Sequence, residues 1–95
     1  MLISGIVMVD VIVFHFTDAG RLPKLTKEEL KDIRAKFLEV LKSYPDVTFY
    51  GTWVDENGRG ICWWEAPSPE IVKEIVEKVL GKPPVDPTIA VEKIL

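Results

Sequence analysis

The chain has 95 residues, of which 47% are hydrophobic and 28% are charged, and its formal net charge is −3. This is the composition of a single soluble globular domain spanning residues 1–95. The negative charge and the scattered Lys and Arg residues argue against nucleic acid as a partner, because phosphate recognition needs a basic surface. One cysteine excludes an intrachain disulfide.

Residues 1–8 are predicted to be an apolar extension ahead of the first strand. They lack the basic segment that opens a secretion signal, and the apolar stretch is too short to span a membrane. The extension either continues the first strand or precedes the true start, since Met8 is a second candidate initiator. We expect a cytoplasmic protein with no membrane partner. One asparagine, no glutamine and many Lys and Glu residues are typical of a thermophilic source.

The first half of the chain predicts a strand followed by a helix. Residues 9–17 are rich in β-branched and aromatic residues on both alternating faces, which is typical of a central strand. The helix is expected to begin after Thr26, which forms a capping box with Glu29, and to stop before Pro45. Its apolar residues recur at intervals of three and four and form one stripe: Leu30, Ile33, Phe37, Leu38, Val40, Leu41 and Tyr44.

Residues 47–66 predict a hairpin that contains all three tryptophans and the cysteine. Asn57-Gly58 between two β-rich runs is typical of a type I′ turn. A two-residue turn and a four-residue loop at residues 55–58 give the same two faces, whereas a three-residue loop would exchange them. With an even loop, one face holds Thr48, Tyr50, Thr52, Ile61, Trp63 and Glu65, and the other holds Phe49, Gly51, Trp53, Cys62, Trp64 and Ala66.

A second helix and a last strand complete the predicted domain. Ser68 and Pro69 are typical of the N-cap and first position of a helix, and Gly81 is typical of its end. This helix is expected to bury Ile71, Val72, Ile75, Val76, Val79 and Leu80. With a strand at residues 88–95, the order β-α-β-β-α-β predicts an α+β, ferredoxin-like fold. In that fold a four-stranded antiparallel sheet has its first and third strands in the centre and both helices on one face.

The remaining sheet face is predicted to be an interface. The apolar set of the hairpin is expected beneath the helices, together with Ile12, Phe14 and Phe16. The open face then presents Val11, Val13, His15 and Thr17 beside the tyrosine, threonines, tryptophan and glutamate of the hairpin. An apolar face of this kind is more often an interface or a pocket than idle surface. We therefore expect a homodimer of the dimeric α/β-barrel kind, with a small cavity between the two sheets.

The second half of the chain also carries a resemblance. Tyr50-Gly-Thr-Trp-Val-Asp55, then Gly60-Ile-Cys-Trp-Trp-Glu-Ala-Pro-Ser68, a helix and a short strand ending near Glu92 resemble a family of small ferredoxin-like proteins that includes a nickel-binding member. The resemblance implies the fold, a dimer, and nickel or another divalent transition metal as a cofactor. Relatives carry further histidines in the helices, whereas this chain has His15 alone.

His15 and Glu65 are the candidate metal ligands and the candidate catalytic residues. One imidazole and one carboxylate from each of two subunits would make a four-ligand site suited to nickel, zinc or iron. Either group would also serve to move a proton. The structural alternative is that His15 is hydrogen-bonded in a half-buried interface and that Glu65 pairs with it or with an arginine.

The candidate ligand-binding residues are Tyr50, Thr52, Trp63 and Thr17. Stacking of Tyr50 and Trp63 on a flat ligand is one role for the aromatic pair, and packing within an interface is the other. Cys62 is expected on the opposite face from His15, as a small buried residue that shares no metal with it.

Two functions are therefore open. The first is a non-enzymatic homodimeric binding protein that holds a small ligand or a metal ion on the open sheet face. The alternative is a cofactor-free dimeric α/β-barrel enzyme, an oxygenase or isomerase that acts on a small aromatic or lactone. In that enzyme His15 or Glu65 would move a proton while the protein walls exclude water.

Overall fold

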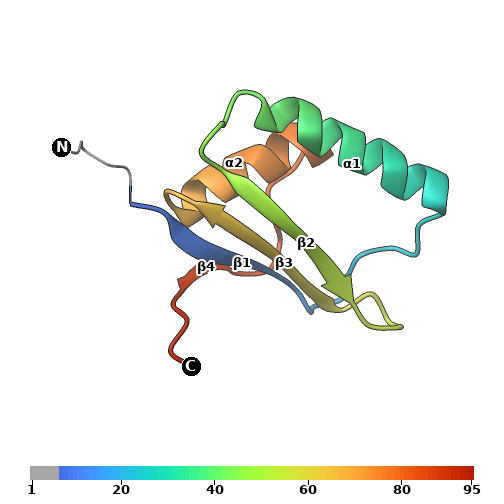
Figure 1. Ribbon diagram of the computed structural model, residues 1–95. Coiled ribbons are helices and arrows are strands. Elements are labelled where there is room, and N and C mark those ends of the chain that lie inside the picture. The colour runs from blue at the N-terminus through green and yellow to red at the C-terminus, as the bar shows by residue number, and fades with distance from the viewer. Residues whose placement is uncertain (1–6) are drawn as a thin grey trace.

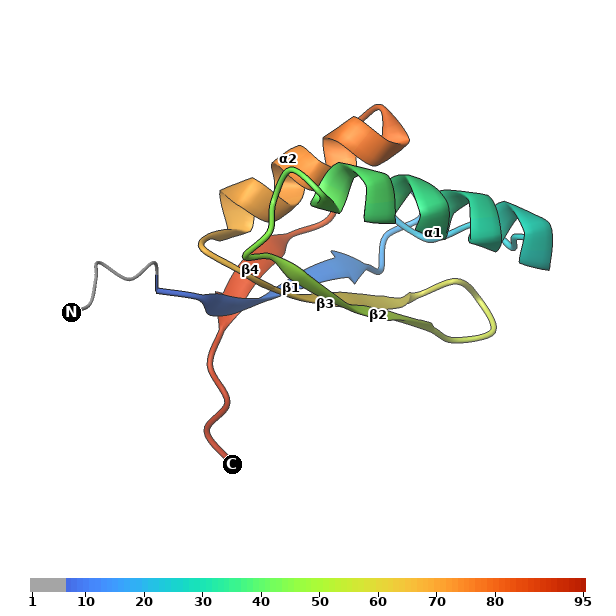
Figure 2. The ribbon, with the colours of Figure 1, turned by 45° about the horizontal axis from the view of Figure 1, so that its top comes forward.

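Two helices cover one face of a four-stranded antiparallel sheet in the computed structural model, which describes residues 7–95 (Figure 1). The elements are β1 (Val9–His15), α1 (Lys27–Leu41), β2 (Thr48–Val54), β3 (Gly60–Ala66), α2 (Pro69–Leu80) and β4 (Thr88–Val91). The strand order β2-β3-β1-β4 places β1 and β3 in the centre, so the predicted α+β architecture is confirmed. Figure 2 shows both helices on one side of the sheet, with the C-terminal residues leaving toward the other. Of the predicted extension at residues 1–8, only Val7 and Met8 fall within the described residues.

Local signals in the sequence determine where both helices begin. Thr26 Oγ1 accepts from the Glu29 backbone N–H at 3.1 Å, and Glu29 Oε1 accepts from the Thr26 N–H at 3.0 Å. This is the predicted capping box, which satisfies two backbone donors that have no partner inside α1. The Ser68 hydroxyl caps α2 by accepting from the Ile71 backbone N–H at 3.4 Å, and Gly81 ends α2 with a φ of 83°. The predicted starts and the end of α2 are confirmed.

The core lies between α2 and the two central strands. Its buried apolar residues are Val11, Val13, Trp64, Ala66, Val72, Ile75 and Val76. In contrast, α1 buries no residue completely, and its Leu30 and Leu38 are 53% and 54% exposed. These two members of the predicted apolar stripe stay outside the core, because α1 packs mainly beside α2 and hollows remain between it and the edge strand β2. Leu80, in the last turn of α2, is also exposed.

The predicted faces of β1 are reversed. Val11 pairs with Trp64 and Val13 with Cys62, and residues directly opposite in antiparallel strands share a face. The two valines therefore lie beneath the helices at 0% and 1% exposure, while Ile12 and Phe14 lie on the open face, the sheet face away from the helices. Phe16 follows β1 and is exposed, so it does not join the core either. Trp64 is the largest fully buried side chain under the helices, and the two smaller valines pack in the same close-packed cluster.

The hairpin loop has five residues, because Val54 pairs with Gly60. Asp55 Oδ1 accepts from the backbone N–H groups of Asn57 at 2.8 Å and Arg59 at 3.0 Å. Gly58 has a φ of 79°, but Asn57 has no positive φ, so the predicted type I′ turn is wrong. An odd loop exchanges the two faces of the hairpin near its tip.

A β-bulge at Tyr50 restores the predicted faces further from the loop. Thr52 pairs with Cys62 and Trp53 with Ile61, so Thr52 lies on the helix side and Trp53 on the open face, opposite to the prediction. Beyond the bulge Phe49 pairs with Trp64 and Thr48 with Glu65, so these four residues lie on the faces predicted for them. One extra residue in β2 therefore compensates for the odd loop, as a bulge shifts all later pairs by one.

Candidate functional site

His15 and Cys62 meet on the helix side of the sheet. His15 follows Val13 by two residues on β1 and so shares its face, while Cys62 lies directly opposite Val13 on β3. The distance from His15 Nε2 to Cys62 Sγ is 3.2 Å, and His15 Nδ1 lies 3.1 Å from the Gly20 carbonyl oxygen. The prediction that these side chains lie on opposite faces is wrong, because it followed from the reversed faces of β1.

The carbonyl of Gly20 determines the state of this pair. A carbonyl accepts only, so Nδ1 carries the imidazole proton and Nε2 is left to accept from the Cys62 thiol. Burial lowers the pKa of His15 from its ordinary value of 6.5, although the hydrogen bond to the Gly20 carbonyl and the charge of Asp86 act to raise it. Burial raises the pKa of Cys62 from 9.0, opposed by the hydrogen bond with Thr52. At neutral pH the contact is therefore a neutral thiol donating to a neutral imidazole.

Asp86 holds the turn that presents Gly20. Its side chain accepts from the backbone N–H groups of Phe16 at 2.6 Å and Thr17 at 3.0 Å, and from the Thr17 hydroxyl at 2.6 Å. The Thr17 hydroxyl is the main cause that lowers the pKa of this carboxyl. Thr17 was predicted to bind a ligand on the open face, but its hydroxyl is engaged here instead. Asp86 was not predicted, and its position in a proline-rich connector gave no sign of a partner near residue 17.

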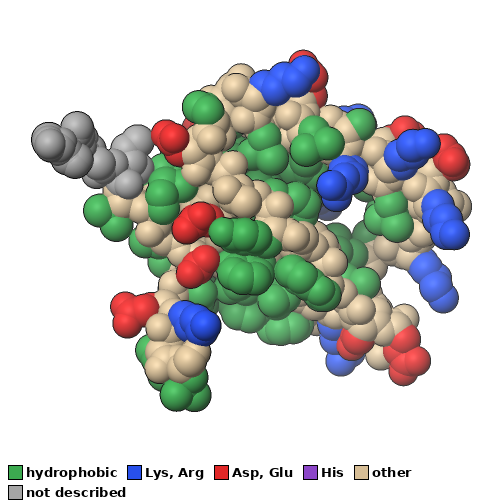
Figure 3. All heavy atoms as spheres, viewed as in Figure 1, with side chains coloured by type: hydrophobic (Ala, Val, Ile, Leu, Met, Phe, Trp, Pro, Cys, Tyr) green, Lys and Arg blue, Asp and Glu red, His purple; other side chains and the backbone are tan. Residues whose placement is uncertain are grey.

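The open face gathers aromatic residues around two carboxylates. The rings of Tyr50 and Trp63 lie 4.3 Å apart, and the Tyr50 hydroxyl donates to Glu65 at 3.2 Å, which raises the pKa of the phenol. Trp63 Nε1 donates to Asp10 at 3.0 Å, and Asp10 lies directly opposite Glu65. Figure 3 shows hydrophobic side chains massed over the sheet beside acidic ones. Tyr50, Trp63 and Glu65 are brought together as predicted, and His15 is not among them.

The predicted four-ligand metal site does not form, because His15 and Glu65 lie on opposite faces of the sheet. Of the two residues proposed to move a proton in the alternative enzyme, only Glu65 lies on the open face. Within residues 7–95 no group of three or more His, Cys, Asp and Glu side chains is placed to hold a metal ion. His15 and Cys62 are thus a pair of donors and not a complete metal centre.

A groove lies between the start of α1 and the hairpin. Its volume is about 480 Å³, and its lining consists of Leu22, Pro23, Lys24, Leu25, Leu30, Thr52, Val54, Asp55, Glu56, Asn57 and Gly58. Figure 3 shows the molecule hollowed in this region. Thr52 belongs to this lining, and its hydroxyl lies 2.9 Å from Cys62 Sγ, so the groove reaches the donor pair through one side chain. The sequence signal for the groove was a pair of leucines, Leu22 and Leu25, in a loop next to a proline.

Comparison with protein families gives one match. The model of the family described as Nickel responsive protein SCO4226-like matches residues 12–86, more than three quarters of the chain. The chain belongs to the Nickel responsive protein SCO4226-like family. The family inferred from the hairpin and its flanking residues is confirmed, and the SCO4226-like match covers both His15 and Cys62. Comparisons with the curated proteins and with the solved structures gave no match. Neither helix in residues 7–95 of this SCO4226-like protein has the length and apolarity needed to cross a membrane.

Proposed function

We propose that this protein is a small, non-catalytic metal-responsive binding protein, and that His15 and Cys62 supply its metal donors. The observation that carries the proposal is the His15 Nε2–Cys62 Sγ contact at 3.2 Å, with Nδ1 anchored on the Gly20 carbonyl. Metal-binding histidines usually donate their second ring N–H to such an oxygen, which orients the ring. Membership of a nickel-responsive family supports this use of the pair.

The donor spacing fits one metal ion. With metal–nitrogen and metal–sulfur bonds of about 2.0 and 2.3 Å, square-planar and tetrahedral angles separate the two donors by about 3.0 to 3.5 Å. Imidazole suits nickel, copper and zinc, and a thiolate adds a soft ligand. Cys62 would bind as the thiolate, so metal uptake releases its proton. Thr52 adds a hydroxyl beside Cys62, and the remaining ligands would be water or donors from a second molecule.

A nickel titration distinguishes this site from the open face. The wild-type protein is expected to bind Ni²⁺ with a thiolate-to-nickel charge-transfer absorption band. Cys62→Ser should abolish the band, and His15→Gln should weaken binding by at least about tenfold, since substitutions even around a metal ligand cost about 10- to 100-fold. Glu65→Gln, on the open face, is the matched control and should leave binding unchanged. If Glu65→Gln removes binding and Cys62→Ser does not, the ion binds where the sequence first suggested and the proposal is wrong.

The homodimer expected from the sequence is part of the same proposal. On the open face Tyr50 is 46%, Trp53 52% and Trp63 38% exposed, next to the exposed Ile89 and Val91 of β4. An apolar surface of this extent on a small domain favours a partner, and a second copy of the same face is the simplest one. The strand order and the element order β-α-β-β-α-β support assignment to the ferredoxin-like folds, of the dimeric α/β-barrel kind. A small ligand between the two sheets would touch Tyr50, Trp63 and Glu65.

Light scattering after size exclusion tests the dimer. The wild-type protein is expected at twice the chain mass, and Trp63→Glu should produce a folded monomer, because it places a charge in the interface. Leu38→Glu changes an exposed apolar residue on α1, away from the open face, and should remain dimeric. A monomeric wild-type protein, or a Trp63→Glu variant that remains a dimer, would remove this part of the proposal.

A further inference from the structure

The groove between the start of α1 and the hairpin has the size and lining of a small-molecule site. Ligand pockets commonly have volumes of about 300 to 1,000 Å³ and are mainly apolar with a few placed polar groups. This groove has about 480 Å³ and combines four aliphatic side chains, Leu22, Leu25, Leu30 and Val54, with the Thr52 hydroxyl. Leu30 and Val54 are 53% and 51% exposed, so burial under a ligand would stabilise both.

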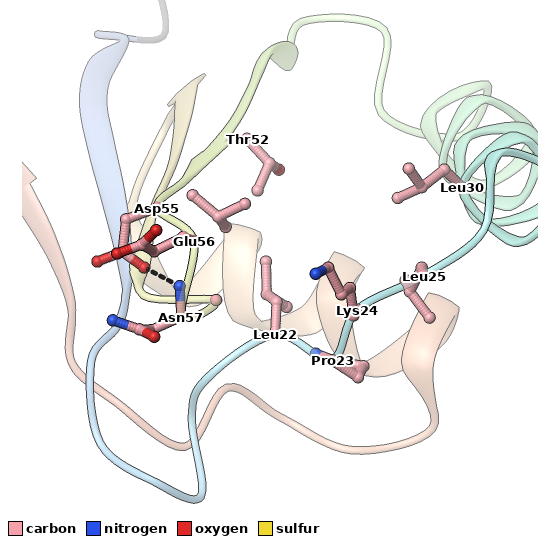
Figure 4. A pocket seen from close by; sticks show the side chains of 11 residues that line it. Leu22, Pro23, Lys24, Leu25, Leu30, Thr52, Asp55, Glu56 and Asn57 are labelled. Carbon is pink, nitrogen blue, oxygen red and sulfur yellow. Dashed lines mark hydrogen bonds between the residues drawn. The ribbon is translucent and has the colours of Figure 1, made fainter.

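Lys24 is the cation of this groove. Figure 4 shows its side chain between Leu22 and Leu25, with the ammonium turned toward the interior. The ion pairs formed within residues 7–95 are Arg21–Asp18, Lys42–Glu39 and Lys78–Glu74, so Lys24 joins none of them. An ammonium over an apolar cavity attracts an anionic group on a ligand whose remainder is apolar.

Two acidic residues, Asp55 and Glu56, also line the groove. The charges of Arg59 and Arg21 act on the Asp55 carboxylate and offset its negative charge in part. The Asp55 carboxylate accepts two backbone N–H groups of its own loop, and those hydrogen bonds lower its pKa. Figure 4 shows Asp55 and Glu56 on the hairpin side, across the groove from Lys24. Gly58 keeps the two walls together, because its carbonyl accepts from the Leu22 N–H at 2.9 Å. The hairpin tip and the loop before α1 are thus joined at one end of the groove, and Lys24 belongs to the loop side.

We infer that this groove binds a small carboxylic acid with an aliphatic body. The carboxylate pairs with Lys24, the chain packs on Leu22, Leu25 and Leu30, and Thr52 lines the groove from β2. The inference does not rest on the proposed metal site, since Cys62 and His15 are outside the lining. A ligand in the groove would nevertheless change the surroundings of the His15–Cys62 pair, because the Thr52 hydroxyl contacts Cys62.

Calorimetric titration of the full-length, metal-free protein with decanoate, below its micelle concentration, tests this inference. Decanoate is expected to bind with one site per chain, and decanol should bind more weakly. Lys24→Ala should weaken decanoate binding about fivefold, the effect of one exposed ion pair, and leave decanol binding unchanged. Lys27→Ala, an equally charged exposed residue outside the lining, should have no effect.

A second pair of variants tests the place of binding. Leu30→Glu puts a carboxylate into the groove and should abolish decanoate binding, whereas Leu38→Glu, at nearly the same exposure on the same helix, should not. Trp63→Ser on the open face and Cys62→Ser at the donor pair should both retain it. Absence of decanoate binding, equal affinity for decanol, equal effects of Lys24→Ala and Lys27→Ala, or loss of binding in Trp63→Ser would each overturn the inference. Failure of nickel binding would leave it standing.

Discussion

Replacement of Trp64 and Trp53 by alanine should have very different effects on stability. Trp64 is fully buried beneath the helices, with its ring centre 4.4 Å from that of Phe49 and 5.6 Å from that of Phe37. Removal of a buried tryptophan typically costs about 3 to 5 kcal/mol. A 95-residue domain has a free energy of unfolding of roughly 5 to 14 kcal/mol, so Trp64→Ala would remove a large part of it. Trp53 is 52% exposed on the edge strand, and Trp53→Ala should cost less than about 1 kcal/mol in the monomer.

Urea unfolding followed by far-ultraviolet circular dichroism measures both effects. The titrations should be run at two protein concentrations, because the proposed dimer would bury Trp53. Any additional cost of Trp53→Ala should then depend on concentration, whereas that of Trp64→Ala should be present at both. Trp64→Phe supplies a variant that folds even if the alanine variant does not. This variant should lower the free energy of unfolding by only about 1 kcal/mol. The lost packing is offset in part, because the substitution removes a buried Nε1–H that has no acceptor among residues 7–95.

Equal costs for the two alanine variants at low concentration would refute this reasoning. Such a result would mean that both tryptophans lie in the core, as an even hairpin loop predicts, and that the bulge at Tyr50 is absent. The assignment of Thr52 to the helix side, and with it the contact to Cys62, would then also fail.

Three further predictions concern the loops. In acid titration of the folded protein, the stabilising effect of Asp86 should be present above its ordinary pKa of 3.8 and lost as the pH falls below it, because folding lowers this pKa. Thr17→Val removes the hydroxyl that contributes most to that shift and should move the acid midpoint upward; an unchanged midpoint would contradict the assignment. Gly58→Ala should cost about 1 to 3 kcal/mol in urea unfolding, since φ is 79° and the added Cβ would lie 2.2 Å from the Leu22 carbonyl oxygen. Gly81→Ala is the control with a similar φ of 83° but no neighbour within 4 Å, so it should cost only about 1 kcal/mol; equal costs would show that the Leu22 contact is unimportant.

Local chemistry in the sequence determined the elements of this protein. The capping box at Thr26, the Ser68-Pro69 start and the Gly81 end depend on atoms within a few residues of one another, so their patterns predict structure directly. The order of the elements, together with the handedness of the connections, then predicts β1 and β3 as the central strands. The hairpin sequence with its flanking elements also carried the family, which the match over residues 12–86 confirms.

Only the tertiary structure decided which face each strand presents. Alternation along a strand has a period of two, so one additional residue in the hairpin loop moves Thr52 and Trp53 each to the face opposite the predicted one. The bulge at Tyr50 then restores the predicted faces for the residues before it. For β1, apolar on both sides, the alternation favours neither face, and only the pairing with β3 places the valines beside the buried Trp64. That pairing brings His15 to Cys62 and separates it from Glu65. The residue types of a site can thus be read from the sequence, but their meeting depends on pairings between strands 47 residues apart.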